Sequence, residues 1–316
     1  MSTYVVCRLL QSVLVLFLVS LTMFALLRSV PEDLLLAQLD QAAALRQEDL
    51  ARARQELGLE RPFWRQYAVW LGAALHGDLG NSLTSQQPVS QELGKRVTLT
   101  LHLVCMALGV ALLLALPASA ISAVWPGTVA DYLGRMLALA GLSCPAFWVA
   151  TMTSTVMTLW RHGMPPIGFE PLWSDPVKCI AQLLLPAVII GARLSAGLMC
   201  VIRAALLKVR RDDCRRIARA KGQRVGALIL QHGLKNVGMP VLTRMGQQFS
   251  VLLGGTVLVE VIFLLPGVGT LTLDAAMLRD YTMLQGAVLF FAGAMVGMKL
   301  CVDLSSACVD PRLRDP

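Results

Sequence analysis

The amino-acid sequence is dominated by apolar blocks of about 20 residues that are separated by shorter polar stretches. A helix of about 20 apolar residues is long enough to cross the ~30 Å hydrocarbon core of a bilayer. Of the 316 residues, 56% are hydrophobic and only 15% are charged, whereas a soluble domain carries roughly a quarter charged residues. We therefore expect an all-α polytopic membrane protein.

Six blocks are expected to span the membrane, at about residues 9–27, 97–124, 136–160, 180–202, 245–265 and 283–302. Pro145 lies inside the third block and is expected to break it. Between the first two blocks, the pattern predicts an outer amphipathic helix near 40–57 and an aromatic-rich interfacial helix near 63–83. The predicted organisation is a first helix in 1–28, an outer helical segment in 29–96 and a five-helix core in 97–316.

A strongly basic stretch, residues 203–244, lies between the fourth and fifth blocks. It holds eleven Lys or Arg residues against two acids, Asp212 and Asp213. Basic loops beside the membrane stay on the cytoplasmic side, so six spans place both termini in the cytoplasm. The net charge of +8 is concentrated here, as membrane orientation requires, so we expect contact with membrane lipid and no nucleic-acid partner.

Motifs for other chemistry are missing from the sequence. The eight cysteines form no CxxC pair and are expected to pack as small apolar residues. There is no HxxxH spacing or close Cys/His cluster, so we expect no metal site. The sequence also lacks GxxxxGK[ST], so ATP hydrolysis is not expected of this chain, and it lacks GxSxG and HExxH.

The basic stretch contains RIARAKG at 216–222 and QHGLKNVGMPV at 231–241. These two runs resemble the EAA loop of permeases from binding-protein-dependent ABC importers, in the form with Arg in place of Glu that is typical of the peptide and nickel (oligopeptide, dipeptide and nickel permease B-type) branch. Other segments resemble this branch in the same order, at 8–31, 56–71, 77–83, 142–148, 183–187, 254–269, 279–286 and 302–314. The resemblance therefore covers nearly the whole chain.

The resemblance implies a type I ABC importer permease fold (MetI-like) in the bacterial inner membrane. It also implies a second, similar permease, two ATP-binding cassette ATPases that bind ATP and Mg²⁺, and an extracytoplasmic solute-binding protein. The chain itself would bind no cofactor. Its coupling helix, which would dock on the ATPases, would be formed by Asp213, Arg216, Ile217, Ala218, Arg219, Ala220, Lys221 and Gly222.

The transported solute stays open between nickel, another metal chelate and a small peptide. The short outer loop at 161–178 leans toward nickel or a metal chelate, by resemblance. Two charges inside predicted spans, Arg193 and Glu260, are candidates for the substrate pathway, because intramembrane charge commonly faces a wet cavity. Alternatively the two side chains pair with each other, or Glu260 is structural. Asp303 is expected to pair with Lys299, four residues earlier, or to reach the membrane surface.

Two other classes of protein are considered. A self-sufficient channel or ion-coupled secondary carrier needs no docking loop and is expected to show inverted repeats or paired broken helices, which the sequence does not show. An intramembrane enzyme would need a catalytic motif or a His–carboxylate pair within a span, and none occurs.

Overall fold

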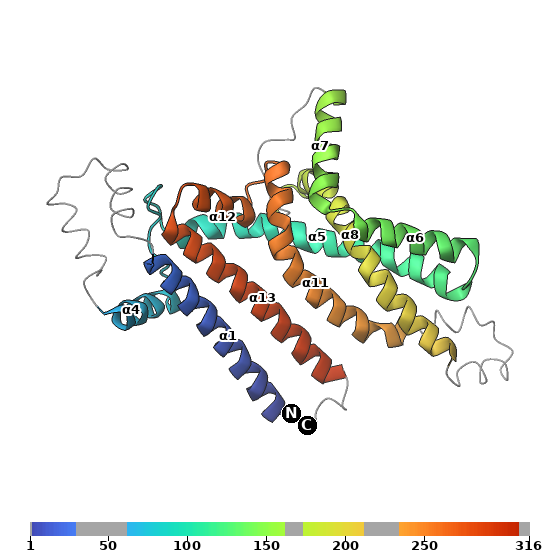
Figure 1. Ribbon diagram of the computed structural model, residues 1–316, viewed down its shortest axis with the longest axis horizontal. Helices are drawn as coiled ribbons and strands as arrows, with labels where there is room; N and C mark the ends of the chain where they lie inside the picture. Colours follow the sequence, from blue (N-terminus) through green and yellow to red (C-terminus); the bar gives the residue numbers. More distant parts are fainter. Residues whose placement is uncertain (1, 30–61, 162–172, 212–233, 310–316) are drawn as a thin grey trace.

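The computed structural model describes residues 2–29, 62–161, 173–211 and 234–309. The described chain is helical, and its helices are arranged as an elongated, open bundle (Figure 1). In chain order the helices are α1 (Ser2–Arg28), α4 (Phe63–Leu75), α5 (Val89–Val124), α6 (Val129–Ser143), α7 (Ala146–Arg161), α8 (Pro176–Arg211), α11 (Leu234–Ile262), α12 (Val268–Met277) and α13 (Tyr281–Val309).

Within the described ranges, five helices are long and apolar enough to cross a membrane: α1, α5, α8, α11 and α13. A sixth span results if α6 and α7 count as one crossing, bent by 87°. The polytopic α-helical architecture predicted from the sequence is therefore confirmed, although the third crossing is not a straight helix.

The bend between α6 and α7 lies at the predicted proline. Helix α6 ends at Ser143, and Cys144 is extended, with φ −84° and ψ 120°. Pro145 follows, and a residue before proline is sterically driven out of the helical region. Helix α7 then begins at Ala146. Pro117, Pro186 and Pro240 instead lie inside continuous helices.

The predicted basic loop is shorter than the stretch 203–244, because helix occupies both of its ends. Helix α8 continues to Arg211, and α11 begins at Leu234. Leu, Ala, Lys and Arg are strong helix formers, so α8 runs on beyond its apolar block into the basic residues. The first turns of α11 contain Gly238 and Pro240, which are poor helix formers, but Val237 and Val241 there are buried in the core. Helix α5 likewise begins at Val89, eight residues before the predicted start of its span.

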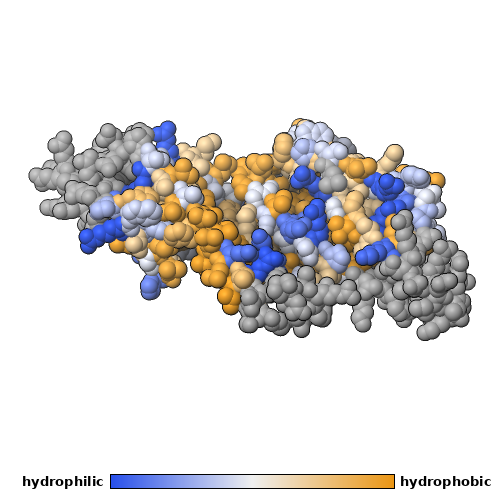
Figure 2. Space-filling model, turned by 60° about the horizontal axis from the view of Figure 1, so that its bottom comes forward, coloured by the Kyte–Doolittle hydropathy of each residue, from blue (hydrophilic) through white to orange (hydrophobic). Residues whose placement is uncertain are grey.

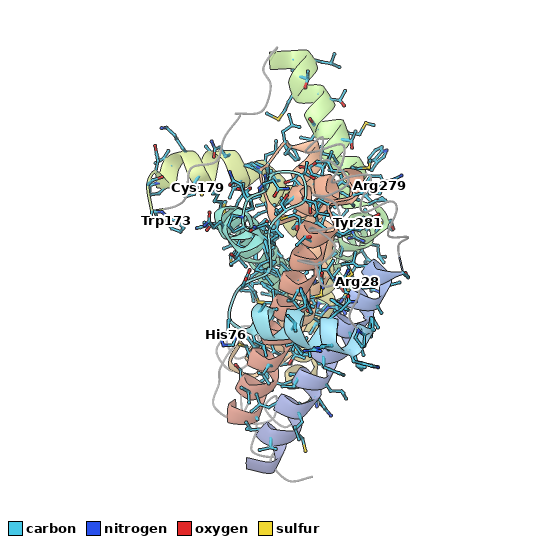
Figure 3. The ribbon with its side chains drawn as sticks, turned by 90° about the vertical axis from the view of Figure 1, so that its left-hand side faces the viewer. Arg28, His76, Trp173, Cys179, Arg279 and Tyr281 are labelled. Atoms are coloured by element: carbon cyan, nitrogen blue, oxygen red, sulfur yellow. The ribbon has the colours of Figure 1, made fainter. Side chains whose placement is uncertain are left out.

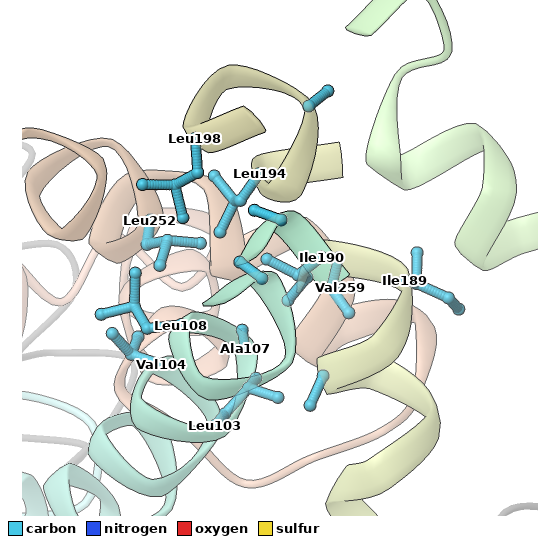
Figure 4. Close-up of a cluster of buried hydrophobic side chains, with 14 of the residues drawn as sticks. Leu103, Val104, Ala107, Leu108, Ile189, Ile190, Leu194, Leu198, Leu252 and Val259 are labelled. Carbon is cyan, nitrogen blue, oxygen red and sulfur yellow. The ribbon is translucent and has the colours of Figure 1, made fainter. Parts of the chain in front are cut away.

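The core lies where α5, α8 and α11 cross. The buried cluster includes Leu103 and Ala107 of α5 and Ile190 of α8, and Leu198 of α8 lies near Leu252 of α11 (Figure 4). The close approach depends on small residues, as is usual for helices packed in a membrane. A Cβ atom on Gly191 would lie 2.7 Å from the carbonyl oxygen of Ala107.

Helices α1 and α13 pack side by side and run in opposite directions, so the start of α1 and the end of α13 lie together (Figure 1). Nε of Arg8 lies 3.4 Å from a carboxylate oxygen of Asp303. The expected pairing of Asp303 with Lys299 is therefore wrong, because a residue distant in sequence but adjacent in space is its ion-pair partner.

An aromatic cluster holds α4 against α1. Phe24 of α1 makes ring contacts with Phe63, Tyr67 and Trp70 of α4, and the Tyr67 and Ser20 hydroxyls are hydrogen-bonded at 2.7 Å. The predicted helix in 63–83 is therefore present but ends at Leu75, and its place at the membrane interface stays a prediction. The predicted amphipathic helix at 40–57 lies outside the described residues.

The start of α8 is attached to α5 at the end of the molecule away from the basic loop. The rings of Trp173 and His102 have centroids 5.7 Å apart. Figure 3 labels Trp173 near the start of α8. Asp175 accepts a hydrogen bond from the backbone N–H of Lys178, which, with the nearby Lys178 ammonium, lowers the pKa of the Asp175 carboxyl. This end of α8 is therefore capped and anchored.

Hydrophobic residues cover most of the described surface in Figure 2, and hydrophilic residues gather in separate patches. Helices α6 and α7 contribute many large exposed apolar side chains, among them Val129, Leu133, Met136, Leu139, Trp148, Leu159 and Trp160. Such a surface is stable against lipid or another membrane helix rather than water.

Candidate functional site at the base of the basic loop

The predicted coupling helix lies outside the described residues. This applies to all eight of its predicted members: Asp213, Arg216, Ile217, Ala218, Arg219, Ala220, Lys221 and Gly222. The structure does describe the two helices that enter and leave this segment, α8 and α11. The site is therefore defined by what holds the ends of these helices in place.

Arg203, eight residues before the end of α8, is bound to the start of α6. Its Nη2 donates to Oδ2 of Asp131 at 3.0 Å, and its Nε lies 3.1 Å from Oδ1 of Asp131 and 2.7 Å from Oγ of Ser122. Asp131 is 2% exposed. A paired guanidinium and carboxylate with this forked geometry is a strong, directional contact.

The turn between α5 and α6 is built to present Asp131. Gly127 adopts φ +77°, a conformation that favours glycine, and its N–H donates to Oδ2 of Asp131 at 3.0 Å. Thr128 is the N-cap of α6, and its hydroxyl accepts from the backbone N–H of Asp131 at 3.5 Å. Ser122 donates to the same carboxylate. Every oxygen of Asp131 is therefore bonded, and we call Ser122, Asp131 and Arg203 the clasp.

The clasp joins three helices at the base of the basic loop. Ser122 belongs to α5, Asp131 to α6 and Arg203 to α8. The ion pair and its hydrogen bonds therefore connect the part of α8 that leads toward the loop with the α5–α6 turn.

Helix α11, on the other side of the loop, packs closely on α8. Nε2 of Gln248 donates to the carbonyl oxygen of Leu194 at 3.0 Å. Arg244 also lies against α8, where a Cβ atom on Gly197 would be 3.2 Å from its Nη2. A cavity of about 480 Å³ lies beside Arg244, between α8, α11 and α13.

Glu260 is fully buried near the opposite end of α11, with 0% exposure. Its Oε1 accepts from the Thr100 hydroxyl at 2.8 Å, and its Oε2 accepts from the backbone N–H groups of Gly269 and Thr270 at 2.8 and 3.2 Å. These amides belong to the first turn of α12, where unpaired N–H groups attract negative charge. The carboxylate therefore holds α12 onto α11 and α5.

Glycine is required where the chain passes Glu260. A Cβ atom on Gly267 would collide with the Glu260 carboxylate, and one on Gly269 would lie 2.7 Å from it. Val268, between them, donates its N–H to Thr100 at 2.9 Å. The glycines of the PGVG sequence at 266–269 therefore leave room for the Glu260 carboxylate to reach the N-terminus of α12.

The structure does not bring the two predicted pathway residues together. Arg193 is exposed on α8, whereas Glu260 is buried, and within the described ranges no hydrogen bond or ion pair joins them. Glu260 is bonded entirely to its own chain, which is the arrangement expected of a structural residue.

A second buried carboxylate organises the turn between α12 and α13. Asp280 accepts from the Ser82 hydroxyl and from the Thr84 N–H at 3.2 Å, and its other oxygen accepts from the N–H of Met283 at 3.0 Å. Arg279 and Tyr281 lie beside it at this turn (Figure 3). Asp280 therefore joins the segment before α5 to the start of α13.

Several residues with defined positions in the structure were missed by sequence reasoning, among them Asp131, Arg203, Arg244 and Asp280. Arg203 and Arg244 were counted as loop charges, because they flank the basic run, and Asp131 was not singled out at all. One usable signal was present: Gly127-Thr128 followed by Asp131 is a helix N-terminus, with a polar cap three residues before an acid. The long-range partner Arg203 has no such local signature.

Comparisons with known proteins agree along the whole chain. Residues 115–315 match the family described as binding-protein-dependent transport system inner membrane component, and residues 1–104 match its N-terminal membrane component. The chain is 33% identical over 314 residues to a glutathione transport system permease protein of Escherichia coli, and 34% identical over 317 residues to the protein of that name from Pectobacterium atrosepticum. Each alignment covers 99% of both chains.

Proposed function

The chain belongs to the family of binding-protein-dependent transport system inner membrane components, and we propose that it imports a small peptide-like solute. It is the multi-pass permease subunit of an ABC importer in the inner membrane, and ATP hydrolysis belongs to partner ATPases. A binding-protein-dependent system also includes a solute-binding protein.

The observation that carries the proposed solute is the identity of 33–34% to glutathione permeases over 99% of both chains. Glutathione is a small peptide with free carboxylates. The relatives compared above are named as glutathione permeases, so we propose a peptide-like solute in preference to nickel or a metal chelate. Selectivity at the first step would lie with the solute-binding protein.

In the proposed mechanism, the ATPases act on this chain through the basic loop. The predicted coupling helix, centred on Arg216 and Gly222, would dock in a groove of an ATPase, with Arg and Lys side chains forming charge-assisted bonds. A second, similar permease would complete the translocation path, and both termini would lie in the cytoplasm. The clasp would pass movement of α8 to the α5–α6 turn.

The solute is tested by reconstituting this chain with its second permease, two ATPases and the solute-binding protein in proteoliposomes. Uptake of radiolabelled glutathione is compared with uptake of a nickel–histidine complex, each with ATP and with a non-hydrolysable analogue. We expect ATP-dependent uptake of glutathione and no ATP-dependent uptake of nickel. ATP-dependent nickel uptake without glutathione uptake would overturn the proposed solute.

The solute-binding protein provides an independent measurement. Calorimetric titration of this protein with glutathione, with dipeptides and with nickel complexes ranks the solutes without any transport step. We expect the peptide-like ligands to bind tightest. Tightest binding of a nickel complex would contradict the proposal.

A further inference from the structure

We infer that the cavity between α8, α11 and α13 binds a carboxylate group of the transported solute, and that Arg244 is the residue that binds this anion. The inference rests on the proposed import of a peptide-like solute, whose carboxylates supply the negative charge. It adds a location on this chain where the passing solute is recognised.

The cavity has the size and lining of a site for a small molecule. It is an open groove rather than an enclosed pocket, and its volume of about 480 Å³ is large enough to admit a small molecule. Its wall combines apolar and polar side chains from three helices: Val201 of α8, Pro240, Thr243, Arg244 and Gln247 of α11, and Ser306 of α13.

Arg244 is a partly buried cation near the start of α11, without an acidic partner in the described part of the chain. It lies seven residues inside the span that begins at Val237. Its one hydrogen bond there joins Nη1 to Oε1 of the neutral Gln247 at 3.3 Å, and its Nε is buried without a partner. Charge inside a membrane protein is costly unless paired, so an unpaired cation beside a cavity indicates a ligand of opposite charge.

The guanidinium of Arg244 lies against helix α8. Gly197 presents bare backbone there, and a Cβ atom on it would lie 3.2 Å from Nη2 of Arg244. Four residues along α11, Gln248 also bonds to α8, at the carbonyl oxygen of Leu194. A carboxylate in the groove would bind the forked N–H groups of Arg244 through two parallel bonds.

A lipid phosphate is the other anion available in a membrane, but the neighbouring side chains favour a peptide. Thr243 and Ser306 carry hydroxyls that donate and accept, and Gln247 carries an amide that does both. A peptide amide also donates and accepts, whereas a phosphodiester only accepts. The cavity therefore complements a carboxylate with amides near it better than it complements a phosphate.

The test places a thiol in the cavity by Thr243→Cys, in the complex of permeases and ATPases in proteoliposomes. The thiol is labelled with sulfonatoethyl methanethiosulfonate, an anion, or with trimethylammonioethyl methanethiosulfonate, a cation, and labelling is quantified at that peptide by mass spectrometry. For each protein, the labelling rate with the anionic reagent is divided by the rate with the cationic reagent. We expect this ratio to be about tenfold higher with Arg244 present than in the protein that also carries Arg244→Gln. A ratio unchanged by Arg244→Gln would overturn the inference.

Competition identifies the ligand. S-methylglutathione, which has carboxylates but no thiol, is expected to slow labelling, and its diester is not. Protection is expected to be lost with Arg244→Gln and weakened with Arg244→Lys, which keeps the charge but not the fork. If S-methylglutathione gives no protection, or if anionic lipid alone slows labelling, the site binds no solute carboxylate. If the unaltered complex does not import glutathione, this result counts against the proposed function. The labelling result still decides whether this site binds a carboxylate.

Discussion

Arg203 of α8 binds Asp131 of α6 through two guanidinium nitrogens, at 3.0 and 3.1 Å, across 72 residues of sequence. The carboxylate is 2% exposed, and the arginine side chain is 22% exposed. The pair lies at the end of α8 that leads into the basic loop. It is the most direct connection that the described chain offers between that loop and the helices α5 and α6.

The clasp predicts a strongly non-additive double-mutant cycle. Removing one partner leaves the other buried and unpaired, so Asp131→Leu and Arg203→Leu are each expected to destabilise the chain by about 3 kcal/mol. The double variant is expected to be destabilised by no more than either single variant. Thermal unfolding of the purified chain in detergent measures all four proteins, and additive losses would show that the pair makes no coupled contribution.

Glu260 is predicted to stabilise α12 through its two hydrogen-bond-accepting oxygens. Glu260→Gln replaces one accepting oxygen by an N–H₂ group that faces the N–H groups of Gly269 and Thr270, so we expect a loss of about 2 kcal/mol. Asp274→Asn is the matched control, because this acid is exposed on the same helix. Thermal unfolding compares the two variants, and equal effects would refute the capping role.

Gly191 is predicted to be intolerant of a side chain. Gly191→Leu would force the side chain against Ala107 and Val110 of α5, so we expect a loss of about 3 kcal/mol and poor recovery of folded protein. Gly109→Leu is the control, because a Cβ atom there meets nothing within 4 Å. Fluorescence-detected size-exclusion chromatography of both variants gives the yield of folded protein. Equal yields would contradict the close crossing of α5 and α8.

Gly222→Asp tests the predicted coupling helix. A side chain and a negative charge at the end of RIARAKG are expected to prevent docking on the ATPase, so uptake is lost and ATP hydrolysis no longer responds to solute. The protein is still expected to insert in the membrane. Gly226→Asp, four residues beyond the motif, is the matched control and is expected to retain uptake. Normal uptake by the Gly222→Asp protein would refute the docking role.

Features that depend on local pattern were predictable from the sequence, and features that depend on distant partners were not. The apolar blocks identified the spans, and Pro145 identified the break in the third one. The end of α8 was misplaced, because Arg and Lys form helix as readily as Leu and therefore leave no boundary signal. The start of α11 was misplaced because Gly238 and Pro240 disfavour helix locally, whereas burial of Val237 and Val241 in the folded chain supports it. Because both helices are longer than expected, Arg203 and Arg244 lie on helices and contact neighbouring helices rather than belonging to the loop.

The charged residues show the same difference between what local sequence pattern predicts and what depends on distant partners. Asp303 was expected to pair within its own helix, but Arg8 of α1 is adjacent in the folded chain and pairs with it instead. Glu260 was recognisable from the sequence as an intramembrane charge, whereas its role in capping α12 requires Gly267 and Gly269 to approach it in space. The basic run 212–222, the part of the site with the clearest sequence signal, lies outside the described residues.

The most direct test of the account is the nucleotide dependence of transport. Proteoliposomes are prepared with the complete importer and with this polypeptide alone, and accumulation of radiolabelled glutathione is followed with and without ATP. We predict accumulation only for the complete importer supplied with hydrolysable ATP and its solute-binding protein. Accumulation at the same rate by this polypeptide alone, with no nucleotide present, would contradict the claim that partner ATPases drive it.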